Sequence, residues 1–169
     1  MINVLMHGCN GKLGRVIAEL IKDSPDCRLV AGVDPNISST AQDFPVFMDI
    51  FDCNVNVDVI IDFSIAHAVP RLLDYATKHH IPVVVCTTGL SDDQIAGVHH
   101  ASTQIPVFFS ANMSLGVNLL MNLAKRASEI LSDSGFDIEI VEKHHNKKID
   151  APSGTAIAIA NVIQESLNN

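Results

Sequence analysis

A glycine-rich turn between an apolar strand and a helix constrains the fold of this chain more than any other feature. Ile2–Met6 is a short apolar run, and Arg15–Lys22 carries the spacing of a helix. Between them, the segment Gly8–Gly14 has glycine at every third position. A strand, a glycine turn and a helix in this order can bring a pyrophosphate onto a helix N-terminus. Glycines also mark ordinary turns, and this spacing departs from the commoner Gly-x-Gly-x-x-Gly, so the motif needs support from the rest of the chain.

An acidic residue after the second predicted strand gives that support. Arg28–Val33 reads as a strand and ends in Asp34, about 20 residues past the turn, where a carboxylate would bond the ribose hydroxyls of a dinucleotide. The alternative is a plain turn residue before Pro35. No arginine or lysine occurs in Pro35–Ser39 to pair with a 2′-phosphate, so we expect NADH to be preferred over NADPH.

Strands and helices then alternate along the chain. Val57–Phe63, Pro82–Cys86 and Ile105–Phe109 read as buried strands, and helices are expected over Ala66–Lys78 and from Ser91 onward. This rhythm predicts an α/β fold, a Rossmann-like doubly wound parallel sheet with right-handed crossovers. Ligands of such sheets bind beyond the carboxyl ends of the strands.

Composition excludes several classes of function. The chain has 169 residues, is 47% hydrophobic and 18% charged, and carries a formal net charge of −8, so a nucleic-acid partner is not expected. No apolar run reaches the length of a membrane span, and no secretory leader is recognised, so we expect no membrane partner and a cytoplasmic location. The four cysteines are scattered, which indicates reduced thiols and no metal site.

The densest chemistry lies near the C-terminus, in Glu142–Ala156. This stretch contains two adjacent histidines and two adjacent lysines, and ends in Asp-Ala-Pro-Ser-Gly-Thr-Ala. We expect it to connect a strand, Asp137–Lys143, to a helix that starts at Ser153–Thr155 after Pro152. Cations beside a helix N-terminus favour an anionic ligand, and histidine can transfer protons near neutral pH. The alternatives are a solvated histidine pair or a metal site, and the second is weak because no third ligand stands at a suitable spacing.

This stretch resembles the signature of the 4-hydroxy-tetrahydrodipicolinate reductase (dihydrodipicolinate reductase) family. The pattern is Glu-x-His-His-x-x-Lys-x-Asp-Ala-Pro-Ser-Gly-Thr-Ala. Three further segments match family motifs in the same order: Asp62-Phe63-Ser64, Cys86-Thr87-Thr88-Gly89 and Asn112-Met113-Ser114-Leu115-Gly116-Val117-Asn118. Cys86 stands where the family usually has glycine, and we expect its side chain to weaken cofactor binding.

The resemblance implies an activity and a set of site residues. The activity is NAD(P)H-dependent reduction of a cyclic dicarboxylate, 4-hydroxy-tetrahydrodipicolinate, to tetrahydrodipicolinate in diaminopimelate and lysine biosynthesis. His144 is the implied general acid, supported by Lys148, and the implied substrate ligands are His145, Gly154 and Thr155. The implied cofactor-binding residues are Gly8, Asn10, Gly11, Lys12, Leu13, Asp34, Phe63, Cys86, Thr87, Thr88, Ser110, Ala111, Asn112 and Met113.

The resemblance also predicts the domain organisation. Residues 1–115 would form the dinucleotide-binding domain, and residues 116–169 the first part of a small α+β substrate domain, entered through a helix over Val117–Ser132. Family members continue beyond this point and form tetramers, so we expect a chain truncated at the C-terminus, whose homo-oligomerisation and activity are in question. Two alternatives stay open: a non-catalytic nucleotide-binding fragment, and another Rossmann oxidoreductase acting on a small dicarboxylate.

Overall fold

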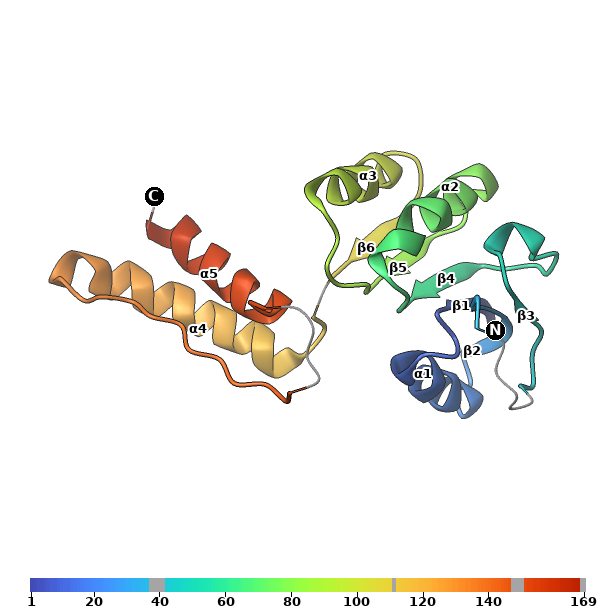
Figure 1. Cartoon of the computed structure of the whole chain (residues 1–169), viewed down its shortest axis with the longest axis horizontal. Coiled ribbons are helices and arrows are strands. Elements are labelled where there is room, and N and C mark those ends of the chain that lie inside the picture. The colour runs from blue at the N-terminus through green and yellow to red at the C-terminus, as the bar shows by residue number, and fades with distance from the viewer. Residues whose placement is uncertain (37–41, 111, 147–150, 168–169) are drawn as a thin grey trace. The chain divides into compact units, whose positions relative to one another are not determined.

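The computed structural model describes residues 1–36, 42–110, 112–146 and 151–167, and its chain divides into two compact units, residues 1–110 and 111–169. The first unit contains a six-stranded sheet with helices on both faces, and the second contains two long helices (Figure 1).

The sheet of the first unit has the order β3-β2-β1-β4-β5-β6. Its strands are β1 (Ile2–His7), β2 (Cys27–Val33), β3 (Val46–Phe47), β4 (Val59–Asp62), β5 (Val83–Val85) and β6 (Val107–Phe109). All five neighbouring pairs are parallel. Because the order runs outward in both directions from β1, the sheet is doubly wound, and the predicted Rossmann-like fold is confirmed.

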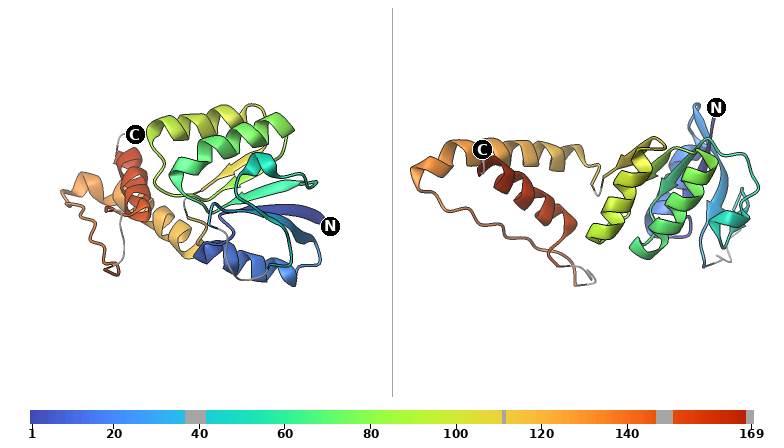
Figure 2. Two further views of the ribbon diagram at one scale, coloured as in Figure 1. Left: turned by 45° about the vertical axis from the view of Figure 1, so that its right-hand side comes forward. Right: turned by 90° about the horizontal axis from the view of Figure 1, so that it is seen from above.

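Helices cover the two faces of this sheet. The helix α1 (Lys12–Lys22) lies on one face, and α2 (Val69–His79) and α3 (Asp92–Ser102) lie on the other (Figure 2). The predicted cap of α3 is present, since Ser91 Oγ accepts from the Gln94 backbone and the Gln94 side chain accepts from the Ser91 backbone. Such a reciprocal box satisfies two N–H groups that have no partner inside the helix.

Two local features differ from the sequence prediction. The helix expected to begin at Ala66 instead starts with a short 3-10 turn, η2 (Ala66–Ala68), and becomes α-helical at Val69. Pro70 explains this, since proline fits the first turn of an α-helix and is unfavourable further inside. The edge strand β3 and the 3-10 turn η1 (Ile50–Asp52) were not predicted.

Apolar side chains of the sheet and of α2 form the core. Leu5, Ile60 and Leu72 are fully buried, and Val83 is 1% exposed. Burying one such side chain contributes about 1.5 to 3 kcal/mol. The strands are apolar on both sides because helices cover both faces, which is why the sequence shows continuous apolar runs rather than alternation.

The second unit packs α4 (Leu115–Leu131) against α5 (Gly154–Leu167), with a 3-10 turn, η3 (Ser132–Ser134), following α4. The Ser114 hydroxyl caps α4 by accepting from the Val117 N–H, so the helix starts two residues earlier than predicted. Several large apolar side chains of this unit are exposed: Leu115, Leu119, Leu123, Phe136 and Val141.

The strand predicted over Asp137–Lys143 is wrong. Residues 136–145 are exposed and carry no regular secondary structure. The alternation of apolar and acidic residues is typical of a strand, but a strand also needs a neighbour to accept and donate its backbone hydrogen bonds. The described part of the second unit contains no strand that could be this neighbour.

No helix in the described parts of the chain combines the length and the apolar character that crossing a membrane requires.

Candidate functional site

The glycine turn connects β1 to α1 at the carboxyl edge of the sheet. Gly8 has a φ of +81°, and a Cβ there would lie 2.6 Å from the Phe63 carbonyl oxygen. The Gly8 N–H donates to Val33 O at 2.8 Å and the Gly11 N–H donates to Gly8 O at 3.1 Å, so the turn is tied to β2 and folded on itself. Gly11 is the N-cap of α1, which points the first N–H groups of the helix at this edge. This backbone geometry suits a phosphate group.

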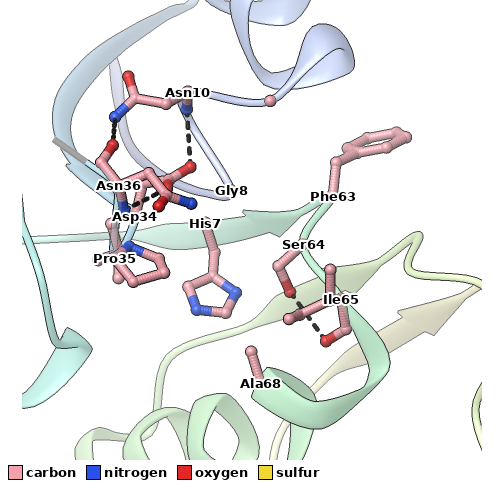
Figure 3. Close-up of a pocket in the computed structure, with 12 residues that line it drawn as sticks. His7, Gly8, Asn10, Asp34, Pro35, Asn36, Phe63, Ser64, Ile65 and Ala68 are labelled. Carbon is pink, nitrogen blue, oxygen red and sulfur yellow. Dashed lines mark hydrogen bonds between the residues drawn. The ribbon is translucent and has the colours of Figure 1, made fainter. Parts of the chain in front are cut away.

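Asp34 holds the turn in place from the end of β2. Its carboxylate is buried and accepts from the Asn10 N–H at 3.0 Å and from the Asn36 N–H at 2.9 Å. The Asn10 side chain in turn donates to the Asn36 carbonyl oxygen (Figure 3). The predicted acid therefore has a structural role in the turn, and its position beside the turn is also the one from which a carboxylate bonds a ribose.

A cavity of about 330 Å³ opens at this edge of the sheet. Its walls come from the ends of β1 and β2 and from the segment between β4 and α2 (Figure 3). The lining residues are His7, Gly8, Asn10, Gly11, Val33, Asp34, Pro35, Asn36, Phe63, Ser64, Ile65 and Ala68. Five of the predicted cofactor residues are among them. The glycine turn in its wall suits a phosphate group, and the Asp34 carboxylate suits a ribose.

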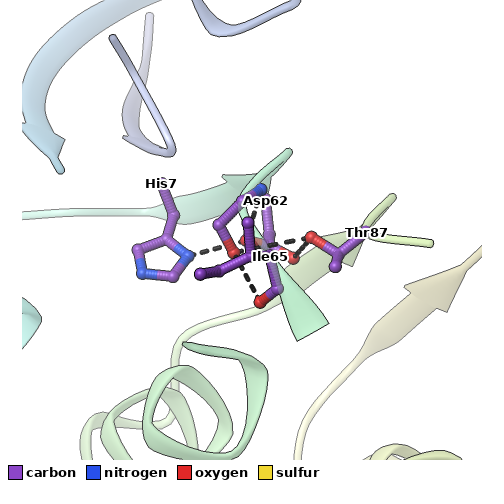
Figure 4. A network of polar contacts seen from close by, with 5 residues as sticks. His7, Asp62, Ile65 and Thr87 are labelled. Atoms are coloured by element: carbon purple, nitrogen blue, oxygen red, sulfur yellow. Dashed lines mark hydrogen bonds and ion pairs between the residues drawn. The ribbon is translucent and has the colours of Figure 1, made fainter. Parts of the chain in front are cut away.

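A buried polar network lies at the ends of β1, β4 and β5. Asp62 Oδ1 is 2.6 Å from His7 Nδ1, and Asp62 Oδ2 accepts from the Thr87 hydroxyl at 2.7 Å (Figure 4). The Ser64 N–H donates to the same carboxylate at 3.2 Å. Asp62 is completely buried, and an isolated buried carboxylate would be costly, so these donors are what allows it to be there. The sequence indicated Thr87 but not the roles of His7 and Asp62.

Other predicted cofactor residues of the first unit lie outside the cavity lining. Lys12, Leu13 and Thr88 are exposed. Cys86 and Thr87 are buried, and burial together with the nearby Asp62 charge raises the pKa of the Cys86 thiol to about 11. The proposed crowding of the cofactor by Cys86 stays a prediction. Ser110 ends the unit, and its N–H donates to Val85 O at 3.1 Å.

The second unit brings one predicted cofactor residue against one predicted substrate residue. Asn112 Nδ2 donates to Thr155 Oγ1 at 3.0 Å, and Asn112 Oδ1 accepts from the Ser114 N–H at 2.8 Å. The Asn112 amide thus connects the start of α4 to the first turn of α5. Met113 is 49% exposed. Ala111 and Lys148 lie outside the described residues.

Glu142 organises the segment that carries the predicted general acid. Its Oε1 accepts from the Ser153 N–H at 2.8 Å, and its Oε2 accepts from the Ser153 hydroxyl and lies 3.4 Å from His144 Nδ1. Ser153 Oγ also accepts from the Ala156 N–H at 3.0 Å and so caps α5. The carboxylate therefore holds the histidine segment to the helix start. His145 is exposed. Glu142 was missed as a positioning residue, and an acid in the segment before a Ser-capped helix was the available signal.

No group of three or more His, Cys, Asp or Glu side chains suited to a metal ion occurs among the described residues.

Comparison with known proteins decides the family. The family model for dihydrodipicolinate reductase, N-terminus, matches residues 2–113, and the model for dihydrodipicolinate reductase, C-terminus, matches residues 116–169. The chain belongs to the dihydrodipicolinate reductase family. The predicted resemblance is confirmed, since the two matches together cover almost the whole chain.

Individual relatives agree with this assignment. A 4-hydroxy-tetrahydrodipicolinate reductase of Caldanaerobacter subterraneus subsp. tengcongensis is 53% identical over 167 residues, which are 99% of this chain and 65% of the relative. One from Clostridium perfringens is 43% identical, over 99% of this chain and 66% of the relative. The chain thus spans 65 to 66% of the length of these two relatives.

Solved structures support the same fold. A dipicolinate-bound dihydrodipicolinate reductase from Paenisporosarcina sp. TG-14 superposes with a TM-score of 0.76 at 28% identity, over 98% of this chain and 66% of that one. A myo-inositol 2-dehydrogenase from Lactobacillus plantarum superposes with a TM-score of 0.56 at 15% identity, over 79% of this chain and 41% of that one. The second likeness concerns the fold alone.

Proposed function

We propose that this chain takes part in the NAD(P)H-dependent reduction of 4-hydroxy-tetrahydrodipicolinate to tetrahydrodipicolinate, in diaminopimelate and lysine biosynthesis. The observation that supports it best is the tight glycine turn with Asp34 beside it, in a member of the reductase family. The first unit holds the cofactor, and the Glu142–Ala156 segment of the second unit acts on the substrate. We place the reaction in the cytoplasm, where the four free cysteines would stay reduced.

The residues of the first unit fit a nicotinamide dinucleotide. A side chain at Gly8 or Gly14 would meet backbone atoms within 3.0 Å, so the turn keeps the close backbone approach that a pyrophosphate needs. Asp34 would accept hydrogen bonds from the adenosine ribose. When bound, the reduced cofactor supplies the hydride, and the 4-hydroxyl group of the substrate leaves as water before that step. A buried carboxylate disfavours an additional phosphate on that ribose, so we propose NADH as the preferred cofactor.

The second unit supplies the proton and the anion contacts. His144, held at its Nδ1 side by Glu142, would donate a proton from its ring to the reduced substrate, and Lys148 would support the same step by its positive charge. Gly154 and Thr155 stand in the first turn of α5, where N–H groups have no acceptor within the helix and suit a carboxylate. His145 would bind the second carboxylate. We propose that the reaction takes place in a homo-oligomer.

An assay of the chain and two variants tests the proposal. NADH oxidation is followed in the presence of 4-hydroxy-tetrahydrodipicolinate for the wild type, His144→Ala and Lys148→Ala, with the exposed His99→Ala as the matched control. We expect kcat to fall about 100-fold or more in the first two variants and to stay unchanged in the control. The NADH dissociation constant should change little in all three.

Other outcomes of this assay would replace or contradict parts of the proposal. NADH binding without turnover in the wild type would replace the proposal by its alternative, a nucleotide-binding fragment without catalytic activity. Clearly tighter binding of NADPH than of NADH would contradict the cofactor preference. A large loss of NADH affinity in His144→Ala would contradict the division of roles between the two units.

A further inference from the structure

We propose that His7 is a cofactor-binding residue whose Nε2 atom donates a hydrogen bond to the diphosphate of the dinucleotide, with Asp62 orienting its ring. This rests on the proposed function, because it takes the cavity to be the NADH site. His7 precedes Gly8 directly and lines the same cavity. The glycine turn needs small residues at its glycines but does not need a histidine before them, so this side chain requires a separate explanation.

The sheet register explains why His7 and Asp62 meet. They are Cα partners in the parallel pair of β1 and β4, at the last position of each strand. Their side chains are 8% and 0% exposed, and Nδ1 lies 2.6 Å from Oδ1. A carboxylate oxygen can only accept, so Nδ1 must carry a proton at this distance, whether the ring is neutral or charged. Asp62 thereby fixes which ring nitrogen is left to interact with anything else.

The Asp62 carboxylate is occupied by hydrogen bonds to other groups of the protein. Besides the ring, it accepts from the Thr87 hydroxyl and from the Ser64 N–H. Three donors from three segments make it a fixed support rather than a ligand. The His7 ring is therefore held in one orientation before any cofactor arrives, and a preorganised donor loses little entropy on binding.

The Nε2 atom is within reach of a ligand in the cavity. The His7 ring interacts with Asp62 through its Nδ1 atom, which leaves Nε2 on the other side of the ring. No fully buried side-chain nitrogen or oxygen among the described residues lacks a hydrogen-bond partner, so Nε2 is not sealed in the core. In the close-up of the cavity the ring lies between the segments that carry Asp34 and Ser64, with Gly8 beside it (Figure 3). The group expected next to Gly8 is the pyrophosphate.

Charged groups of other elements lie near His7. They are Asp62 at the end of β4, Asp34 after β2, and Asp49 before η1 with its ion-pair partner Arg71 on α2. The proposed contact requires a proton on both ring nitrogens, since Asp62 accepts the N–H of Nδ1 and the diphosphate accepts the N–H of Nε2.

Two substitutions of His7 test the contributions of its two ring nitrogens separately. The amide nitrogen of an asparagine occupies about the place of Nδ1, so His7→Asn keeps a donor for Asp62 and removes Nε2. The amide nitrogen of a glutamine reaches about as far as Nε2, so His7→Gln keeps a donor toward the cavity and removes the one for Asp62. The first should retain the melting temperature of the wild type, and the second should lower it. His67→Asn removes an exposed histidine of η2 and serves as the control for the loss of a histidine.

The experiment is a titration of each protein with NADH, followed by fluorescence, at about pH 7. We expect His7→Asn to bind NADH about tenfold more weakly than the wild type, His7→Gln to bind it more tightly than His7→Asn, and His67→Asn to match the wild type. A folded His7→Asn protein with the NADH affinity of the wild type would overturn the role of His7 while leaving the proposed function in place. Failure of the wild type to bind NADH would overturn both.

Discussion

Replacing Gly14 by alanine tests how tightly the glycine turn packs on the start of α1. Gly14 is buried in the first turn of this helix, and a Cβ there would lie 2.2 Å from the Gly8 carbonyl oxygen. It would also lie 2.9 Å and 3.0 Å from the Cα and carbonyl carbon of Cys9. All three atoms belong to the backbone of the turn, so they cannot move away as the end of a flexible side chain can.

The geometry sets the size of the effect. Ordinary contacts of a Cβ begin at 3.4 Å, so the turn would have to move by about 1 Å. Forcing an extra carbon into a packed site costs about 1 to 3 kcal/mol, and displaced backbone belongs at the upper end of that range. Alanine regains at most about 1 kcal/mol through its better helix propensity. We therefore expect Gly14→Ala to lower the free energy of unfolding by about 2 kcal/mol, and to weaken NADH binding because the Gly8–Gly11 hydrogen bond shifts with the turn.

Gly97→Ala in the exposed middle of α3 is the matched control, since a Cβ there meets no atom within 4 Å. It should raise the free energy of unfolding by about 0.5 to 1 kcal/mol and leave NADH binding unchanged. Urea unfolding followed by circular dichroism measures both variants under the same conditions. If Gly14→Ala were as stable as Gly97→Ala, the close approach of the turn to α1 would not be a property of the folded protein.

Two further predictions concern side chains away from the turn. Burial, aided by the nearby carboxylates, raises the pKa of the Cys9 and Cys86 thiols to about 11. Iodoacetamide at about pH 8 should therefore alkylate the half-buried Cys27 and Cys53 first. Mass spectrometry that finds all four cysteines modified at equal rates in the folded protein would contradict this. Arg71→Gln should lower the free energy of unfolding by less than about 1 kcal/mol at neutral pH, because the side chains of the Arg71–Asp49 pair are 59% and 36% exposed. The Arg71 side chain, followed by the Phe51 backbone N–H, lowers the pKa of Asp49 below its ordinary value of 3.8. The contribution is thus fully present above 3.8 and is lost as the pH falls through the lower folded pKa. A wild-type advantage in the free energy of unfolding that grows as the pH is lowered below 3.8 would refute the assignment.

The parallel sheet was predictable because each central strand is marked by its own residues. Val57–Phe63 and Pro82–Cys86 are apolar on both sides, as strands covered by helices must be. The edge strand β3 was not, because Val46–Phe47 is too short to show a period. It becomes a strand through backbone hydrogen bonds at the end of β2, such as Asp34 N–H to Phe47 O at 3.0 Å. Such pairing depends on where a loop returns in space, which local sequence does not state.

The geometry of the candidate cofactor site was predictable to the same extent. Gly8 and Asp34 stand at fixed separations from a strand, as in turns that bind a phosphate and a ribose. The network of His7, Asp62 and Thr87 was not predictable, because its members are 55 and 25 residues apart and meet through strand register. In the sequence, Asp62 was visible only as the acid that ends a strand and opens a family motif. Its burial, which makes it an anchor for two other side chains, follows from the arrangement of β1, β4 and β5.

Glu142 changes how the helix start of the second unit should be understood. The sequence led us to expect an anion site at the N-terminus of α5, open to a substrate carboxylate. In the structure, a carboxylate of the protein already accepts from the Ser153 N–H and hydroxyl, one residue before the helix begins. A substrate carboxylate would therefore have to use the next two N–H groups, those of Gly154 and Thr155, with Glu142 close by. Because two carboxylates repel at short range, cations of the same segment make that site more favourable, which is a physical reason for the histidines and lysines in the sequence of Glu142–Ala156.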